Sequence, residues 1–376
     1  MLDGQNSRLW VLVLTTYFAA HTMIRVAIGM PLTPDEAQLL ATATDMAWHY
    51  GNQLPLYFWL QNGMLELIAD PLISLALLKN LIMLILALAV FGAVRAAAPV
   101  HWAWLATICM LFLPQLSWTS QHAMGAPVLA TSLAALTVLA VVAVRKSPVM
   151  LRFFWLGLVA GLGLITTPSF QWFLVALLLA VLSQPHYRRV ALSWRILPAA
   201  AVAGGIAAMP YTALFRIDRS LILIDLSRVS MSLDQVLERV RDGYAFLQTG
   251  IMFAAILLVG ICVVIYKGLG PRHATKPETA ALRDLIARVV CIGFLSLLTA
   301  AIVFGRNTNE FAEIQPIMFL TAPAAVLYLY PLMTSQAHRT FAVAAAAAAM
   351  VVLVLSPAYY AFGPHLPAEP IALLDR

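Results

Sequence analysis

Residues 33–61 read TPDEAQLLATATDMAWHYGNQLPLYFWLQ, and they follow directly after the first apolar segment that is long enough to cross a bilayer. Two adjacent carboxylates, Asp35 and Glu36, therefore stand just outside the membrane. A polar and aromatic turn that contains Pro55 comes after them. A membrane enzyme could use an acid at such a position against a lipid-linked substrate, so this stretch is the most informative part of the sequence.

The same stretch predicts two short helices. Thr33 suits the N-cap of the first helix, Pro34 its first position and Glu36 its third position, which completes a capping box. The apolar residues that follow recur at helical spacing, so we expect this helix to lie on the membrane surface with one apolar face. A second helix should start at Pro55 and carry its apolar side chains on one side, at Leu56, Leu60, Met64 and Leu67.

The first outer loop is thus predicted to comprise residues 30–71, as two interfacial helices joined by a polar corner, with Asp70 beginning the next span. A purely structural explanation of its acids stands beside the functional one. A carboxylate in the first turn of any helix gains roughly 0.3–1 kcal/mol from the helix dipole. Tyr50 and Tyr57 could equally be ordinary aromatic residues of a membrane interface. Spacing alone leaves both explanations open.

Composition assigns the chain to the membrane. Of its 376 residues 62% are hydrophobic and only 11% are charged, and the mean hydropathy is +0.87. A soluble domain of this size could not bury so much apolar surface, so we predict an all-α, polytopic bundle in which residues 1–376 form a single integral membrane domain. We place eleven spans near residues 9–29, 72–94, 102–118, 126–144, 153–167, 170–183, 196–215, 249–266, 289–304, 316–334 and 340–360.

The charged residues predict the orientation, because Lys and Arg are retained on the cytoplasmic side of a membrane. With the N-terminus inside, the inner segments hold 14 of the 23 basic residues and only 3 of the 17 acidic residues. The basic excess of the chain is therefore explained by topology and gives no reason to expect a nucleic-acid partner. An odd number of spans also puts the C-terminus outside.

Three further segments carry candidate site residues. The outer loop 216–248 contains another amphipathic helix, which we expect on the outer leaflet. Lys79 lies inside the second span, where an ammonium group must snorkel, pair or face a cavity, so it is a candidate for binding a buried phosphate. Arg306 and Glu310 lie in a late outer loop ahead of a helix started by Pro316, and helix capping is the plain alternative there.

The three cysteines give no sign of a metal site or a disulfide framework. Cys109, Cys262 and Cys291 each fall in an apolar span without paired spacing, so we expect them to pack as small core residues. No group of His, Cys, Asp and Glu has the spacing of metal ligands, and we predict no essential metal.

Several motifs resemble one enzyme family. The segments 34–38 (PDEAQ), 50–61 (YGNQLPLYFWLQ) and 78–80 (LKN) resemble the first outer loop and second span of the bacterial family 39-like, C-type membrane glycosyltransferases. These enzymes are relatives of protein mannosyltransferases and of the aminoarabinose transferase that modifies lipid A. The segments 161–166 (GLGLIT) and 315–320 (QPIMFL) are also similar to segments of that family.

The resemblance implies a GT-C-like enzyme that moves a sugar from a polyprenyl-phosphate carrier to a lipid, glycan or protein acceptor on the extracytoplasmic side of the cytoplasmic (inner) membrane. Asp35 would be the catalytic base of an inverting, single-displacement transfer, because the attack of a hydroxyl on an anomeric carbon needs a base. Glu36 would support it or contact the acceptor. The substrate-binding candidates are Tyr50, Gln53, Tyr57, Lys79, His122, Arg306 and Glu310, and no cofactor is implied.

The chain departs from the family pattern ahead of the fourth span. Family members often have a second outer-loop acid there, whereas this chain has only His122, a candidate to take its place. That absence, and a chain that stops at Arg376, favour a second hypothesis: a non-catalytic member of the fold that binds lipid-linked sugar. A lipid-linked sugar transporter is a third hypothesis. It would call for internal repeats and ionisable groups in the middle of the membrane, whereas the sequence shows no repeat and few charges deep in its spans.

Overall fold

A computed structural model of the chain describes residues 2–29, 32, 34–42, 46–51, 53–113, 116–117, 120, 125–217, 262, 275–304 and 311–362. Within these ranges the protein contains helices and no strands, as the sequence predicts for an all-α bundle. The predicted span 249–266, apart from one residue of it, and the predicted amphipathic loop 216–248, apart from its first two residues, lie outside the described residues.

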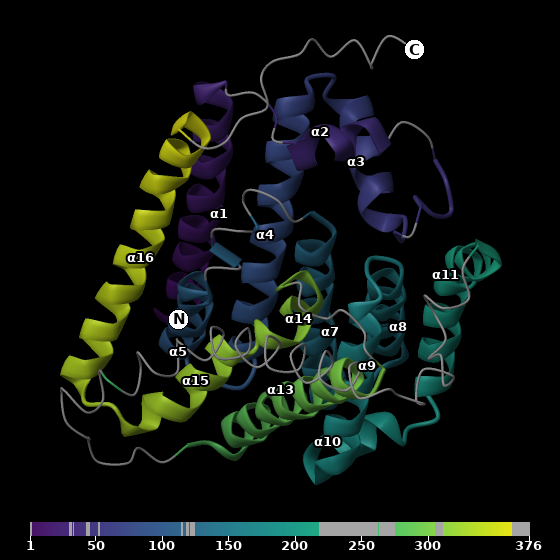
Figure 1. The fold of residues 1–376 in the computed structure, drawn as a ribbon. Coiled ribbons are helices and arrows are strands. Elements are labelled where there is room, and N and C mark those ends of the chain that lie inside the picture. The colour runs from purple at the N-terminus through teal and green to yellow at the C-terminus, as the bar shows by residue number, and fades with distance from the viewer. Residues whose placement is uncertain are drawn as a thin grey trace.

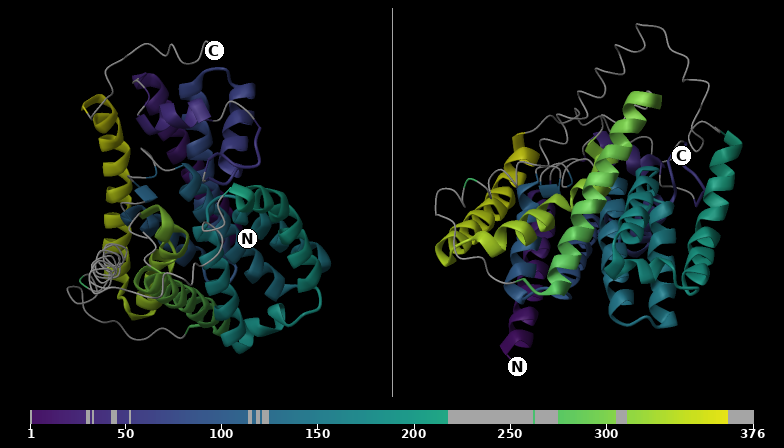
Figure 2. Two further views of the ribbon diagram at one scale, coloured as in Figure 1. Left: turned by 45° about the vertical axis from the view of Figure 1, so that its right-hand side comes forward. Right: turned by 90° about the horizontal axis from the view of Figure 1, so that it is seen from below.

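The helices are arranged as one bundle (Figures 1 and 2), with α1 and α16 on one side and α8 and α11 on the other. In chain order the helices are α1 (Leu2–Ile28), α2 (Pro34–Thr42), α3 (Leu56–Leu67), α4 (Pro71–Arg95), α5 (Val100–Cys109), η1 (Met110–Phe112), α7 (Gly125–Lys146), α8 (Met150–Leu164), α9 (Ser169–Ser183), α10 (Pro185–Ala191), α11 (Ile196–Ile217), α13 (Pro277–Phe304), α14 (Phe311–Met318), α15 (Thr321–Leu329), η5 (Tyr330–Leu332) and α16 (Ser335–Phe362).

The protein is a multi-pass membrane protein, and the predicted total of eleven spans is not confirmed. Among the described residues six segments are long and apolar enough to cross a membrane, or seven if the bent pair α9 and α10 counts as one span. Two predicted spans correspond to the short helices α5 and α8. With 10 and 15 residues they fall short of the roughly 20 residues that a hydrocarbon core needs, so their apolar composition alone does not establish that they cross the membrane.

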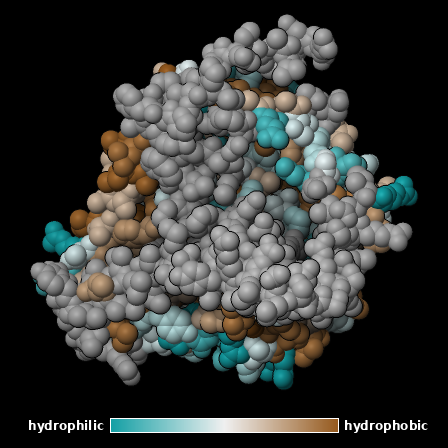
Figure 3. All heavy atoms as spheres, in the orientation of Figure 1, coloured by the Kyte–Doolittle hydropathy of each residue, from teal (hydrophilic) through white to brown (hydrophobic). Residues whose placement is uncertain are grey.

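Burial separates the centre of the bundle from its periphery. The apolar side chains of α4 and α7 are mostly buried, and Ser132 on α7 donates a hydrogen bond of 3.1 Å to the backbone oxygen of Ile82 on α4. The outer helix α16 instead exposes apolar side chains, and Figure 3 shows a hydrophobic surface on that side of the molecule. Its exposed residues are suited to contact lipid tails, and they include Val343, Met350, Val351, Val354 and Leu355.

The pairing of α8 with α11 depends on small residues. A Cβ atom added at Gly157 of α8 would lie 2.3 Å from the backbone oxygen of Ala199, and one at Gly161 would lie 2.9 Å from the Cα atom of Ala203. Gly157 and Gly161 are four residues apart and lie on the same side of α8, so the two backbones approach each other closely along this glycine seam. Close approach of this kind is what associates helices in a membrane, where burial of apolar surface gives little driving force.

The glycine seam yields a testable prediction. Replacing Gly157 with Ala should destabilise the protein by about 1–3 kcal/mol, because the new methyl group overlaps the backbone of α11. The matched control is Gly204→Ala on α11, where nothing lies within 4 Å of the added atom, and it should be neutral or stabilising by up to about 1 kcal/mol. Thermal unfolding in one detergent measures both, and equal melting temperatures for the two variants would contradict the seam.

Candidate active site in the first outer loop

The helices α2 and α3 lie together at one end of the bundle (Figure 1), and local signals set where they begin. The helix α2 starts at Pro34, as the sequence predicts, and α3 starts at Leu56 directly after Pro55. Asp70 caps α4, since its Oδ1 accepts hydrogen bonds from the backbone nitrogens of Leu72 (2.9 Å) and Ile73 (3.0 Å). The helix α3 packs against both α2 and α4.

A buried ion-pair cluster joins three helices beneath α2. The carboxylate of Glu36 accepts a hydrogen bond from Nη2 of Arg25 on α1 at 3.2 Å and another from Nζ of Lys79 on α4 at 3.4 Å. All three side chains are at most 8% exposed. A buried carboxylate loses its hydration and needs compensating charges and hydrogen bonds, which these two cations supply. We call Arg25, Glu36 and Lys79 the cationic cluster.

The cluster refines the sequence interpretation of its members. The sequence left open whether the Lys79 ammonium group snorkels, forms an ion pair or faces a cavity, and the structure shows the ion pair with Glu36. Thr33, the expected partner of Glu36 in a capping box, lies outside the described residues. Sequence reasoning missed Arg25 as a site residue, although a guanidinium in the last turn of a membrane span is a signal that calls for a nearby acid.

Asp35, the proposed base, immediately precedes Glu36 in the first turn of α2. The backbone of that turn is described, whereas the Asp35 side chain is not. Since Glu36 is tied to both α1 and α4, the ion pairs fix the segment of backbone that carries Asp35 against the ends of two spans. The cluster thus holds the candidate catalytic acid at the boundary between the helical bundle and its outer loop.

The polar corner between α2 and α3 is a tight turn. Two backbone hydrogen bonds between Tyr50 and Gln53 close it, at 3.0 and 2.9 Å, and Gly51 between them adopts φ +57°, which side-chain-bearing residues rarely do. The Tyr50 ring stacks on Phe58 at 4.3 Å, and its hydroxyl accepts a hydrogen bond of 3.1 Å from the Ala47 backbone nitrogen. Tyr50 is therefore held in place by the turn, while the Gln53 side chain is exposed.

The residues of α3 that are buried in the bundle differ in part from its predicted apolar side. The buried residues are Leu56, Tyr57, Phe58 and Gln61, whereas Leu60 and Leu67 of the predicted apolar side are 39% and 81% exposed. The Leu56 backbone nitrogen donates a hydrogen bond of 3.1 Å to the Ile165 oxygen at the end of α8, which ties the start of α3 to the bundle. That the apolar side of α3 faces the membrane stays a prediction.

Tyr57 lies at the contact between α3 and the start of α7. A Cβ atom added at Gly125 would lie 2.1 Å from the Tyr57 ring, so this glycine makes room for the aromatic side chain. Burial, and secondarily the nearby Glu36 carboxylate, raises the pKa of the Tyr57 phenol well above its usual value. The phenol therefore stays protonated across the physiological range and keeps its hydrogen to donate.

Two buried glutamines add polar groups that the sequence analysis did not single out. Gln61 donates a hydrogen bond of 2.9 Å to Ser74 on α4, and Gln315 on α14 donates one of 3.1 Å to Ser120. Both glutamine side chains are fully buried, and the carbonyl oxygen of each has no hydrogen-bond partner among the described residues. A single glutamine in an apolar helix gives no local sequence signal that tells whether its side chain is buried or exposed.

The remaining predicted site residues are not placed. His122, Arg306 and Glu310 lie outside the described residues, so the expected convergence of Lys79 with Arg306 stays a prediction. The helix expected to start at Pro316 begins earlier, at Phe311, and contains Pro316 in its second turn, which corrects the predicted start. Within the described ranges no three His, Cys, Asp or Glu side chains gather in a way that could hold a metal ion.

The fold and its relatives define the class of protein. No protein-family profile matches the chain. The crystal structure of ArnT from Cupriavidus metallidurans in the apo state is similar with a TM-score of 0.61, over 98% of this chain and 67% of that chain, at 15% identity. The oligosaccharyltransferase of Archaeoglobus fulgidus in the apo form gives a TM-score of 0.51, over 95% and 56%, at 12% identity. The chain thus has the fold of the C-type membrane glycosyltransferases.

Two curated relatives narrow the comparison. The chain is similar to the lipopolysaccharide core galacturonosyltransferases RgtA and RgtB of Rhizobium johnstonii (strain DSM 114642 / LMG 32736 / 3841), with 25% identity over 319 residues and 28% identity over 307 residues. These matches cover 82% and 79% of this chain, but 63% and 60% of the relatives, so the chain spans somewhat less than two thirds of their length. The resemblance to C-type glycosyltransferases is therefore confirmed.

The cationic cluster predicts that replacing its one acid with an uncharged residue strongly lowers the stability of the protein. Replacing Glu36 with Gln removes the charge that faces Arg25 and Lys79, and it should destabilise the protein by about 3–5 kcal/mol because two buried cations lose a carboxylate that compensates their charge. Glu66→Gln is the matched control, since Glu66 is an exposed residue of α3, and it should change stability by less than about 0.5 kcal/mol. Thermal unfolding of the purified proteins compares them, and a Glu36→Gln variant as stable as its control would refute a structural role for the cluster.

Proposed function

We propose that the chain transfers a sugar from a polyprenyl-phosphate carrier to an acceptor on the extracytoplasmic side of the cytoplasmic membrane, with its N-terminus in the cytoplasm. The observation that carries the proposal is the cationic cluster, buried beneath the turn of α2 whose backbone carries Asp35, in a chain with the fold of C-type glycosyltransferases. Two cations and two acids next to the ends of membrane spans suit a reaction between a lipid-borne phosphate and a hydroxyl group. Residues 1–376 act as one membrane domain in this proposal.

The proposed reaction is a single displacement. The hydroxyl oxygen of the acceptor forms a bond with the anomeric carbon of the sugar as the bond from that carbon to the phosphate oxygen breaks, so the configuration inverts. Asp35 takes the proton of the hydroxyl group, and the polyprenyl phosphate leaves with the electron pair. The leaving phosphate needs cations rather than an acid, and Lys79 is the candidate cation on the described part of the chain.

The named relatives supply the substrates to test first. The relatives RgtA and RgtB are named as galacturonosyltransferases of the lipopolysaccharide core, and the ArnT structure from Cupriavidus metallidurans with TM-score 0.57 was solved bound to undecaprenyl phosphate. We therefore propose polyprenyl-phosphate-linked galacturonic acid as the donor and a lipopolysaccharide core glycan as the acceptor. The further substrate contacts proposed from the sequence are Glu36, Tyr50, Gln53, Tyr57, His122, Arg306 and Glu310.

Removing the proposed base should abolish transfer. Asp35→Asn keeps the shape of the side chain but removes its basicity, so the rate of sugar transfer should fall by roughly 10²–10⁴-fold, the usual contribution of general base catalysis. Asp70→Asn is the matched control, because an asparagine can still cap α4 and the rate should stay near that of the wild type. Transfer of labelled galacturonic acid in membranes measures both rates.

Three outcomes of that assay are distinct. An Asp35→Asn variant as active as the wild type would overturn the role of Asp35. A wild-type chain that binds the labelled donor without turnover would instead indicate a non-catalytic member of the fold. Movement of the intact donor across the membrane, without transfer of its sugar, would indicate a transporter.

Variants of Lys79 test whether its ammonium group binds the donor phosphate. Lys79→Met should weaken binding of undecaprenyl phosphate at least tenfold, because it removes a cation at the proposed phosphate position, whereas Lys79→Arg should retain most of the affinity. Both variants alter the ion pair with Glu36, so the thermal stability of each is measured alongside. Equal affinity of Lys79→Met and the wild type for undecaprenyl phosphate would place the donor phosphate elsewhere.

A further inference from the structure

At the end of the bundle opposite α2 and α3, we infer a surface that binds the headgroups of anionic phospholipids in the adjacent membrane leaflet. The surface combines exposed basic residues with exposed apolar residues around α10, whose place in the bundle Figure 1 shows. We call it the α10 surface. It consists of the exposed residues Arg188, Arg189, Leu192, Trp194 and Leu197 and of the half-buried Arg195.

The geometry of α10 is that of a helix lying along a membrane surface. The chain turns by 119° between α9 and α10, more than a right angle, so α10 runs across the end of the bundle instead of continuing the span. Gln184 at the bend is buried and donates a hydrogen bond of 2.9 Å to the Ala281 oxygen on α13. The bend is thereby fixed to a neighbouring helix, and α10 holds one orientation relative to the bundle.

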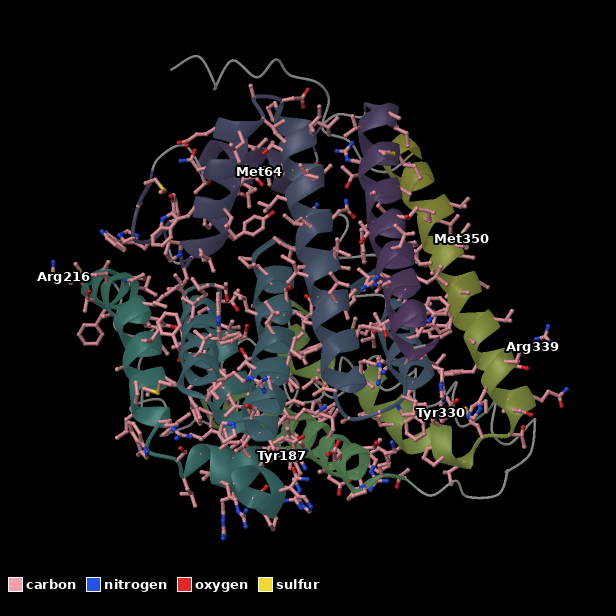
Figure 4. The ribbon with its side chains drawn as sticks, turned by 180° about the vertical axis from the view of Figure 1, so that it is seen from behind. Met64, Tyr187, Arg216, Tyr330, Arg339 and Met350 are labelled. Atoms are coloured by element: carbon pink, nitrogen blue, oxygen red, sulfur yellow. The ribbon has the colours of Figure 1, made fainter. Side chains whose placement is uncertain are left out.

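The two faces of α10 are chemically different. Tyr187 and Val190 are buried against the bundle, and the Arg145 guanidinium lies 5.2 Å from the centre of the Tyr187 ring. Figure 4 labels Tyr187 at this end of the molecule. Arg188 and Arg189 are exposed on the opposite side, and among the described residues neither forms an ion pair or a hydrogen bond through its side chain. The apolar face thus anchors α10 and leaves its arginines to the surroundings.

Apolar side chains next to α10 remain exposed as well. Leu192, Trp194 and Leu197 are 68%, 67% and 68% exposed, and the Arg195 guanidinium lies 5.9 Å from the Trp194 ring. Arg195 also donates a hydrogen bond to the Pro148 oxygen, which joins this segment to the loop before α8. In the first turn of α8, Leu151 is 65% exposed. Tryptophan and leucine beside arginine are the combination found where a helix enters the boundary between headgroups and lipid tails.

The charge of the α10 surface selects the lipid. Arg288 of α13 adds a further cation beside the end of α9, since it donates hydrogen bonds of 2.8 Å to both oxygens of Ser183. On the described part of α13 near this end the acids are Glu278 and Asp284, and Asp284 is paired with Arg283 at 2.9 Å. Positive charge therefore exceeds negative charge here, and anionic headgroups complement it while zwitterionic headgroups do not.

The test measures lipid bound to the purified full-length chain by native mass spectrometry, with phosphatidylglycerol and phosphatidylcholine as probes. The double variant Arg188→Gln/Arg189→Gln should lose affinity for phosphatidylglycerol by about fivefold for each arginine removed, with phosphatidylcholine unaffected. Arg188→Lys/Arg189→Lys keeps the charge and should retain the affinity. Arg216→Gln is the control, because Arg216 is an exposed arginine at the other end of α11, as Figure 4 shows.

Several results would overturn the inference. Unchanged phosphatidylglycerol binding in the double glutamine variant, an equal loss in Arg216→Gln, or a parallel loss of phosphatidylcholine would each do so. If the glutamine variant fails to accumulate, the lysine variant is titrated with sodium chloride. Phosphatidylglycerol binding should then weaken as salt screens the charges, and salt-independent binding would contradict the inference.

Discussion

The arrangement of the candidate site depends on one buried carboxylate. The buried carboxylate of Glu36 needs compensating charges, and it obtains them from two different spans, through Arg25 and Lys79. This requirement fixes the start of α2 over α1 and α4, and with it the backbone that carries Asp35. The tight turn at Gly51 and the contact of Tyr57 with Gly125 then position α3 on the same end of the bundle.

The two ends of the molecule use charge differently. At the end formed by α2 and α3, cations are buried and paired with an acid inside the protein. At the end formed by α10, the cations Arg188 and Arg189 are exposed and turned away from the bundle. The first arrangement suits chemistry on a charged substrate that must leave water, and the second suits attachment to a charged surface. The positive-inside asymmetry of the sequence thus corresponds to two distinct physical roles.

Local signals made much of the fold predictable from the sequence. Pro34, Pro55 and the Asp70 cap act within a few residues of themselves, so the starts of α2, α3 and α4 follow directly from the sequence. Apolar runs likewise identified most of the long helices. The motif at residues 34–38 pointed to the class of enzyme that the comparisons support. These features depend on neighbours in the chain and need no knowledge of the packed bundle.

Other features depend on contacts between distant segments, and the sequence could not supply them. Glu36 and Lys79 are 43 residues apart, and nothing local shows that they meet. The residues of α3 that are buried depend on contacts with other helices, among them the hydrogen bond from the Leu56 backbone nitrogen to Ile165. The number of complete crossings likewise does not follow from apolar runs alone, because helices as short as α5 and α8 are also apolar.

The chain spacing of the cationic cluster has a consequence for biogenesis. Arg25 precedes Glu36 by 11 residues, and Lys79 follows it only after α3 and the start of α4 have been made. During synthesis Arg25 therefore meets its acid early, while α4 must carry its ammonium group into the bilayer before docking. A lysine in a span opposes insertion, by up to roughly 2.5–3.5 kcal/mol at the centre. In the folded protein the ion pair with Glu36 offsets part of that penalty, so the second span depends on the first outer loop to hold its ammonium group.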